Sequence, residues 1–163
     1  MTVFYCPLCW TEFREDVAQC PPCGASLHES LDKDEYAVKL VRALGHPEPT
    51  TVVRAATILG SLRERRAVRP LLALLDSNRD PYSLESAVEA LGEIGDPDAL
   101  EGIIDALARS YLRVRGKAAE ALGKLKDDRA REALTQALHD PSGYVRACAR
   151  GALVKLGHDE PVA

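Results

Sequence analysis

The chain has 163 residues and a formal net charge of −4, which argues against a general binder of nucleic acid or of anionic membranes. Aromatic residues make up only 5% of it, while alanine and leucine are frequent, a composition that favours closely packed helices over sheets. Its apolar runs fall short of the roughly 18 residues that span a bilayer, and its N-terminus lacks the basic and hydrophobic regions of a signal peptide. We therefore expect a cytoplasmic protein without a membrane segment.

Four of the five cysteines lie near the N-terminus, as Cys6-Pro-Leu-Cys9 and Cys20-Pro-Pro-Cys23. Two Cys-x-x-Cys pairs on either side of ten residues are typical of a tetrahedral thiolate site. Gly24 permits the left-handed backbone that closes the second pair. We expect one structural Zn²⁺ per chain, held by all four thiolates with no open position for catalysis. Iron in a rubredoxin-like site remains the alternative metal, and disulfides fit a cytosolic chain poorly.

Residues 4 to 27 resemble the short zinc-ribbon module with paired CPxCG knuckles, which occurs at the N-terminus of many bacterial proteins. The chain departs from that pattern at Trp10, where the first knuckle normally has glycine. Between the cysteine pairs, a single Arg14 stands against three acidic residues, Glu12, Glu15 and Asp16. This balance argues against a nucleic-acid-binding ribbon. We expect Trp10 to pack on its own ribbon or on the first helix, with a role as a partner-binding anchor as the alternative.

From Asp34 onward the sequence repeats with a period near thirty. The clearest marker recurs at spacings of 32, 31 and 31, as Gly60, Gly92, Gly123 and Val154. Each period contains two amphipathic runs, which is the signature of stacked helical hairpins. We therefore expect an all-α fold, an α-solenoid of about four hairpins preceded by the ribbon. The expected organisation is a ribbon over 1–27, a linker over 28–33 and the solenoid over 34–163.

Eight helices are expected, with boundaries set by turn and cap signals. Asp96-Pro97 is a helix N-cap followed by proline, and Asp127 or Asp128 is the equivalent cap one repeat later. The helices are expected near 34–44, 50–62, 67–76, 82–94, 97–109, 112–125, 128–139 and 142–156.

Equivalent apolar residues in successive repeats mark the helix sides that face the core. The first helix and every second helix thereafter carry Leu40, Leu71, Ile103 and Leu134, together with Leu44, Leu75, Leu107 and Leu138. The alternate helices carry Ala55, Ala87, Ala118 and Ala149, then Leu59, Leu91, Leu122 and Leu153, then Leu62, Ile94, Leu125 and Leu156. The alanines allow close helix approach and the larger residues fill the space between layers.

The segments VRGKAAEALGKLKD and YVRACARGALVKLG resemble the short HEAT-like repeats of the phycobilin-lyase type, and the resemblance extends over about 34 to 157. It implies an α-solenoid used mainly for protein–protein interaction. The arginine that opens the first helix of such repeats is present as Arg115 and Arg146, which we expect to pair with acidic groups in neighbouring turns. In the last repeat Arg150 replaces a small or apolar residue, so we expect the final helix to be a solvent-facing cap.

Enzymatic relatives of such repeats offer two comparisons. Di-iron hydroxylases carry paired His-Glu dipeptides, but here the one such dipeptide is His28-Glu29, outside the solenoid. Bilin lyases are the second comparison, on the type of repeat, and the candidate thiol is Cys148. The repeat register places Cys148 at least partly toward solvent, and nothing indicates a lowered pKa. We expect a non-catalytic adaptor or scaffold that binds another protein. The alternatives are an accessory or chaperone subunit of a bilin-lyase-like enzyme complex, and a nucleic-acid-binding HEAT-like protein.

One exposed side of the solenoid is the expected partner site. Taking Leu44 and its equivalents as origin, the residues six and two places earlier fall on what we expect to be the concave face. They are Val38, Arg42, Arg69, Ala73, Glu101, Asp105, Glu132 and Gln136. Charge changes along this row from basic near the ribbon to acidic near the C-terminus, which predicts a protein segment of opposite polarity as the ligand. An ordinary solvated face explains the same pattern, and Trp10 or the tyrosines Tyr82, Tyr111 and Tyr144 mark alternative surfaces.

Overall fold

The computed structural model describes residues 4–5, 11–13, 17–24, 26, 33–77, 79–109 and 111–157. Near the N-terminus, strand β1 (Phe4–Tyr5) pairs antiparallel with β2 (Glu12–Phe13), with Phe4 opposite Phe13. An isolated antiparallel bridge joins Gln19 to Ser26. These short pairings lie inside the stretch that resembles a zinc ribbon.

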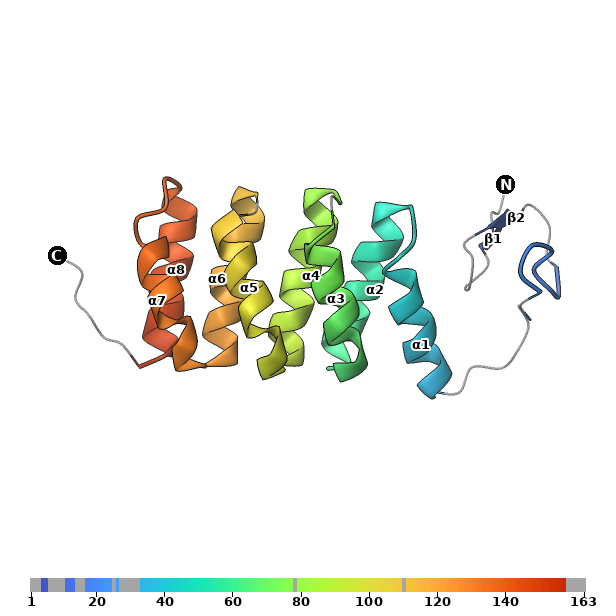
Figure 1. Cartoon of the computed structure of the whole chain (residues 1–163), viewed down its shortest axis with the longest axis horizontal. Helices are drawn as coiled ribbons and strands as arrows, with labels where there is room; N and C mark the ends of the chain where they lie inside the picture. Colours follow the sequence, from blue (N-terminus) through green and yellow to red (C-terminus); the bar gives the residue numbers. More distant parts are fainter. Residues whose placement is uncertain are drawn as a thin grey trace.

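Eight α-helices follow one another along the described part of the chain, as the sequence predicts (Figure 1). They are α1 (Lys33–Ala43), α2 (Pro49–Ser61), α3 (Val68–Leu75), α4 (Pro81–Ile94), α5 (Leu100–Arg109), α6 (Leu112–Leu125), α7 (Arg131–Ala137) and α8 (Gly143–Lys155). The all-α solenoid is therefore confirmed. None of the helices described in the structure is long and apolar enough to cross a membrane.

Short 3₁₀ turns precede three of these helices; for the second and third, the sequence predicts one continuous helix that includes the turn. The turns are Arg65–Ala67, Pro97–Ala99 and Asp128–Ala130. In each case the residue before the turn has a carboxylate that accepts a hydrogen bond from the backbone N–H two residues later. These residues are Glu64, Asp96 and Asp127. This local hydrogen bond tightens the first turn and satisfies an otherwise unpaired donor. Asp127, rather than Asp128, is thus the cap of the last such turn.

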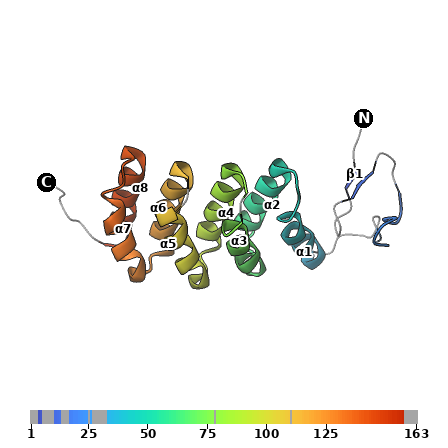
Figure 2. The same cartoon turned by 45° about the horizontal axis from the view of Figure 1, so that its top comes forward.

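The helices form two layers, visible in Figures 1 and 2. Helices α1, α3, α5 and α7 make one layer, and α2, α4, α6 and α8 make the other. Each helix of the first layer packs on its successor, and the helices of the second layer stack directly on one another. Four hairpins side by side are the arrangement that the repeat period predicts.

The recurring glycine explains the close stacking of the second layer. A Cβ at Gly60 would lie 2.9 Å from Ala90 Cα, and one at Gly92 would lie 2.8 Å from Ala121 Cβ. Gly123 meets Ala152 in the same way, with 2.8 Å to its Cα. Because each glycine faces the alanine of the next helix, the backbones approach more closely than any larger pair would permit.

The core runs the length of the solenoid between the two layers. Of the predicted inward-facing residues, Leu59, Leu91 and Leu122 are fully buried, and those near the ends of helices are buried or half-buried. Leu62 is the exception, since 55% of its surface is exposed. Helix α2 ends at Ser61, and Arg63 takes a left-handed φ of 50°, so Leu62 lies in the turn, whereas its equivalent Ile94 still lies within α4.

Candidate functional site

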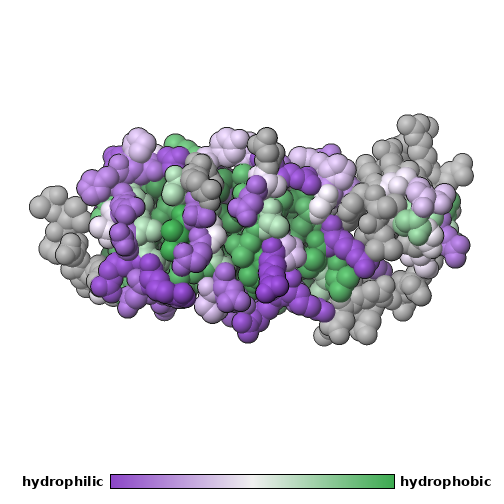
Figure 3. Space-filling view, in the orientation of Figure 1, coloured by the Kyte–Doolittle hydropathy of each residue, from purple (hydrophilic) through white to green (hydrophobic). Residues whose placement is uncertain are grey.

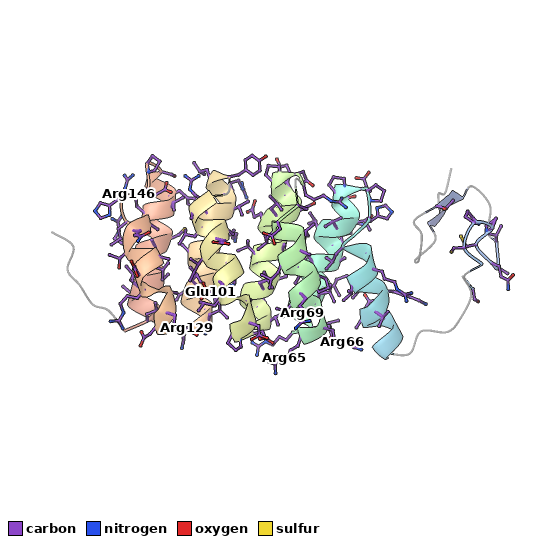
Figure 4. All side chains as sticks on the ribbon, viewed as in Figure 1. Arg65, Arg66, Arg69, Glu101, Arg129 and Arg146 are labelled. Carbon is purple, nitrogen blue, oxygen red and sulfur yellow. The ribbon has the colours of Figure 1, made fainter. Side chains whose placement is uncertain are left out.

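The predicted partner-binding residues all come from the layer of α1, α3, α5 and α7. Seven of the eight are exposed and Val38 is half-buried. We call their surface the odd-helix face, defined by Val38, Arg42, Arg69, Ala73, Glu101, Asp105, Glu132 and Gln136. Figure 3 views this layer from outside and shows apolar side chains between hydrophilic ones along the row of helices. Figure 4 labels Arg69 on α3 and Glu101 on α5, and it shows Arg129 near Glu101.

The two arginines of the odd-helix face are not neutralised within the described part of the protein. Among the described residues, neither Arg42 nor Arg69 forms an ion pair. The carboxylate of Glu132 accepts only a long hydrogen bond, 3.5 Å, from the Gln136 amide. Basic side chains therefore stand exposed on α1 and α3, and acidic side chains on α5 and α7, as the sequence predicts.

The opposite layer shows the contrasting pattern, because cations of α6 pair with anions of α4 along the helices. Arg113 makes two hydrogen bonds of 2.9 Å to Glu85. Next along the helices, the ammonium of Lys117 lies 3.3 Å from Glu89, and that of Lys124 lies 2.6 Å from Glu93. Such exposed pairs contribute little to stability, but they neutralise the charges where α4 and α6 lie side by side. Arg42 and Arg69 on the odd-helix face have no such pairing among the described residues.

A hollow of about 320 Å³ lies between α5 and α7, beside the odd-helix face. Buried Leu107 and Ala137 and half-buried Ile104 line it, together with polar side chains, those of Gln136, His139 and Asp140. Sequence periodicity does not reveal this hollow, since it depends on which small residues face each other across two helices. It supplies an apolar recess next to the acidic half of the face.

Three exposed tyrosines line another edge, at the N-terminal ends of α4, α6 and α8. Tyr82 is 69% exposed, Tyr111 53% and Tyr144 45%. The ring of Tyr144 packs against Gly116. Arg113 lies close to Tyr82 and Tyr144, and its guanidinium donates a hydrogen bond to Glu85. Tyrosine and arginine are common in interfaces, so this edge is a second exposed surface. Its described cations are engaged inside the protein.

Ion pairs between successive hairpins hold the turns in place. Arg65 donates to Asp96, 31 residues on, at 2.7 Å. Arg115 donates two hydrogen bonds to Asp140, at 2.8 and 3.0 Å, as predicted. The guanidinium of Arg115 holds the pKa of Asp140 below its ordinary range. Arg146 differs from the prediction, because its side chain donates to the carbonyls of Asp140 and Pro141 instead of to a carboxylate.

Half of the predicted metal site lies among the described residues. The Gly24 N–H donates to the Cys20 carbonyl at 2.8 Å, and Gly24 has a φ of +72°, so the second Cys-x-x-Cys segment closes through a left-handed glycine as predicted. Cys20 is buried and Cys23 exposed, and no disulfide joins them. Cys6 and Cys9, like Trp10 and His28, lie outside the described residues. The described residues contain no group of three potential metal ligands, so the four-thiolate site stays a prediction.

Cys148 is half-buried on α8, in agreement with the repeat register. Its thiol lies 3.6 Å from a carboxylate oxygen of Glu120. Burial raises the pKa of the Cys148 thiol, so the environment disfavours the reactive thiolate.

These observations define the class of protein, which is an α-solenoid of stacked helical hairpins. The sequence matches the family of HEAT repeats over residues 37–115 and 100–163, and the chain therefore belongs to that family. No curated protein matches it. Among solved structures it is similar to a chain in the complex of CpcE and CpcF of phycocyanin lyase from Nostoc sp. PCC7120. The TM-score is 0.67 and the identity 26%; the similarity covers 88% of this chain and 59% of that one.

Proposed function

We propose that the protein is a non-catalytic adaptor that holds a partner protein on the odd-helix face. The observation that carries this proposal concerns charge pairing: Arg42 and Arg69 stand without ion pairs among the described residues, whereas the cations of α6 pair with the anions of α4. Exposed arginines without ion pairs favour a partner segment that carries acidic residues, and they speed association more than they raise affinity.

The N-terminal residues 1–27 form, in this proposal, a zinc ribbon connected through 28–33 to the solenoid of 34–163. The Cys20–Gly24 turn supports it, since its left-handed glycine and the N–H bond to the Cys20 carbonyl suit a thiolate knuckle. Cys6, Cys9, Cys20 and Cys23 would hold one Zn²⁺ as four protein ligands, a coordination that supplies folding free energy and leaves no catalytic position.

A second candidate is an accessory subunit of a bilin-lyase-like enzyme complex. The similarity to a chain of the CpcE and CpcF complex favours it. Under this reading the protein binds a bilin as well as a protein. Titration with a bilin, followed by its visible absorption, separates the two candidates: saturable binding supports the accessory subunit, and unchanged spectra at high protein concentration support the adaptor.

Affinity purification from the source cell, using three versions of the full chain, tests the adaptor. The first is the wild type, and the second carries Arg42→Glu and Arg69→Glu. The third is a matched control, Arg54→Glu with Arg150→Glu, which reverses two exposed arginines that likewise form no ion pair within the described residues. These control residues lie on α2 and α8, in the opposite layer.

We expect the wild type and the control to recover the same partner, and the Arg42/Arg69 variant to recover much less of it. Exposed charge reversals scarcely change stability, so loss of the partner reports on binding. Equal recovery with all three versions would place the binding surface elsewhere.

A further inference from the structure

The first three helices and their connections are basic, although the whole chain is acidic. Residues 33–79 contain nine lysines and arginines against five aspartates and glutamates, whereas the chain carries a net charge of −4. Four of these cations lie within seven positions around the turn that connects α2 to α3, as Arg63, Arg65, Arg66 and Arg69. Positive charge is therefore concentrated where α3 begins.

Two of the arginines at this turn form ion pairs in which the cation is the more exposed partner. Arg65 donates to Asp96 at 2.7 Å, yet 75% of its side chain is exposed against 7% for the aspartate. Arg66 lies 2.9 Å from Glu64 and is likewise more exposed than its carboxylate. Asp98 also acts on Arg65. These pairs carry little net charge, but they orient two guanidinium groups whose outer sides contact solvent.

The excess positive charge next to these pairs comes from Arg69 and Arg42. Both are exposed, and neither side chain forms an ion pair or hydrogen bond among the described residues. Arg69 follows Arg66 by three positions, so the two side chains lie on the same side of the helical backbone. Figure 4 labels Arg65, Arg66 and Arg69 around the beginning of α3. Three arginines thus stand together at this end of the helix.

Arg42 stands on the neighbouring helix of the same layer. It is equivalent in the repeat to Ala73, four positions beyond Arg69 on α3. Four helical residues advance about 6 Å and neighbouring helices lie about 8–10 Å apart, so the Cα atoms of Arg42 and Arg69 are about 10–12 Å apart. An extended chain advances about 3.3 Å per residue. Acidic side chains about three or four positions apart therefore reach both arginines.

The basic surface ends at the next helices of the layer. At the positions equivalent to the two arginines, α5 and α7 carry no cation but Glu101, Asp105, Glu132 and Gln136. A long polyanion such as a nucleic-acid duplex, laid along the layer, would meet acidic side chains there. Two helices span about 20 Å, which equals about six extended residues. The surface therefore fits a short acidic stretch.

We propose that Arg42, Arg65, Arg66 and Arg69 bind a short acidic segment of the partner protein, whose aspartate or glutamate carboxylates accept hydrogen bonds from the guanidinium groups. This inference rests on the proposed adaptor function and deepens it in two respects. It adds the arginines at the beginning of α3 to the site, and it limits the charged contact to α1, α3 and the turn before α3.

Designed peptides test the inference on the full chain. The probe is a fluorescein-labelled peptide with glutamates at alternate places over about six positions, flanked by glycine and serine. One control peptide has glutamine at the same places, and a short labelled DNA duplex is the second control. Fluorescence anisotropy at low ionic strength measures the binding of each probe to the wild type and to the variants.

Three variants are compared with the wild type. The first carries Arg42→Gln with Arg69→Gln, and the second carries Arg66→Gln. The third is a matched control, Arg54→Gln with Arg150→Gln, which also removes two exposed cations without ion pairs among the described residues. The two double variants change the net charge equally, so a difference between them reports on the site. Far-UV circular dichroism confirms that each variant is folded.

We expect the glutamate peptide to bind the wild type about tenfold or more tightly than the glutamine peptide, and added salt to weaken its binding. Arg42→Gln with Arg69→Gln should weaken that binding about tenfold and Arg66→Gln about threefold, while the control pair leaves it unchanged within about twofold.

Four results would overturn the inference. They are equal binding of the glutamine peptide, equal losses in both double variants, tighter binding of the DNA duplex than of the glutamate peptide, and no peptide binding below about 1 mM. The adaptor proposal fails separately, if capture of the natural partner is insensitive to reversal of Arg42 and Arg69. Sensitive capture of a partner that has no acidic stretch would contradict this inference alone.

Discussion

Replacement of Gly92 by alanine probes the close stacking of α4 on α6. A Cβ at residue 92 would lie 2.8 Å from Ala121 Cβ and 3.0 Å from its Cα, whereas carbon atoms pack at about 3.5–4.0 Å. The two helices must therefore separate. Overpacking of this kind costs about 1–3 kcal/mol, and the higher helix propensity of alanine offsets about 1 kcal/mol of it. We expect Gly92→Ala to lower the free energy of unfolding by up to about 2 kcal/mol.

Gly151→Ala is the matched control, because Gly151 also lies within a helix but no atom stands within 4 Å of its Cβ position. There only the propensity gain of about 1 kcal/mol remains. Thermal and urea unfolding followed by circular dichroism should separate the two variants by about 1–3 kcal/mol, with about 2–4 °C in melting temperature for each kcal/mol. Equal stabilisation by both substitutions would refute the close approach of α4 and α6.

Two further predictions concern the metal and the turns. Elemental analysis should find one zinc per wild-type chain, which Cys148→Ser retains and Cys20→Ser loses. Removal of the zinc with a chelator should leave the helical circular-dichroism signal nearly intact, because stacked repeats depend on their neighbours. Zinc-free wild-type protein would contradict this prediction. Arg115 lowers the pKa of Asp140 in the folded protein below its ordinary 3.8. As the pH falls, Asp140 is therefore protonated at a higher pH in the unfolded chain than in the folded one. The contribution of the pair to the free energy of unfolding is complete above about pH 5 and declines in acid. Asp140→Asn should cost about 1–3 kcal/mol near neutral pH and flatten the acid decline; an unchanged pH profile in urea unfolding would count against the pair.

The repeat period is sufficient to predict the solenoid because the residues that recur with this period are those that determine helix packing. Gly60, Gly92 and Gly123 recur at positions where helices touch backbone to side chain, and the leucines around them recur with the helical period. Leu62 continues that apolar pattern yet lies exposed. Periodicity marks which side of a helix faces the core, but the end of α2 depends on the left-handed turn at Arg63.

Only part of the candidate site can be predicted from the sequence. Projection onto a helix suffices to place Arg42, Arg69 and Glu132 on an exposed face, since it needs only helical geometry. The hollow between α5 and α7 is not predictable in this way, because it depends on how the side chains of two helices meet. Arg115 and Arg146 likewise share a motif position, but one binds a carboxylate and the other backbone carbonyls.

The most direct test of the adaptor is hydrogen exchange of the full chain, measured with and without the captured partner. Added protection is expected in segments covering α1, α3, α5 and α7, whose exposed residues form the odd-helix face. The exposed sides of α4 and α6, where cations and anions pair with one another, should show no change. Protection confined to the N-terminal ends of α4, α6 and α8, around Tyr82, Tyr111 and Tyr144, would contradict the proposed surface.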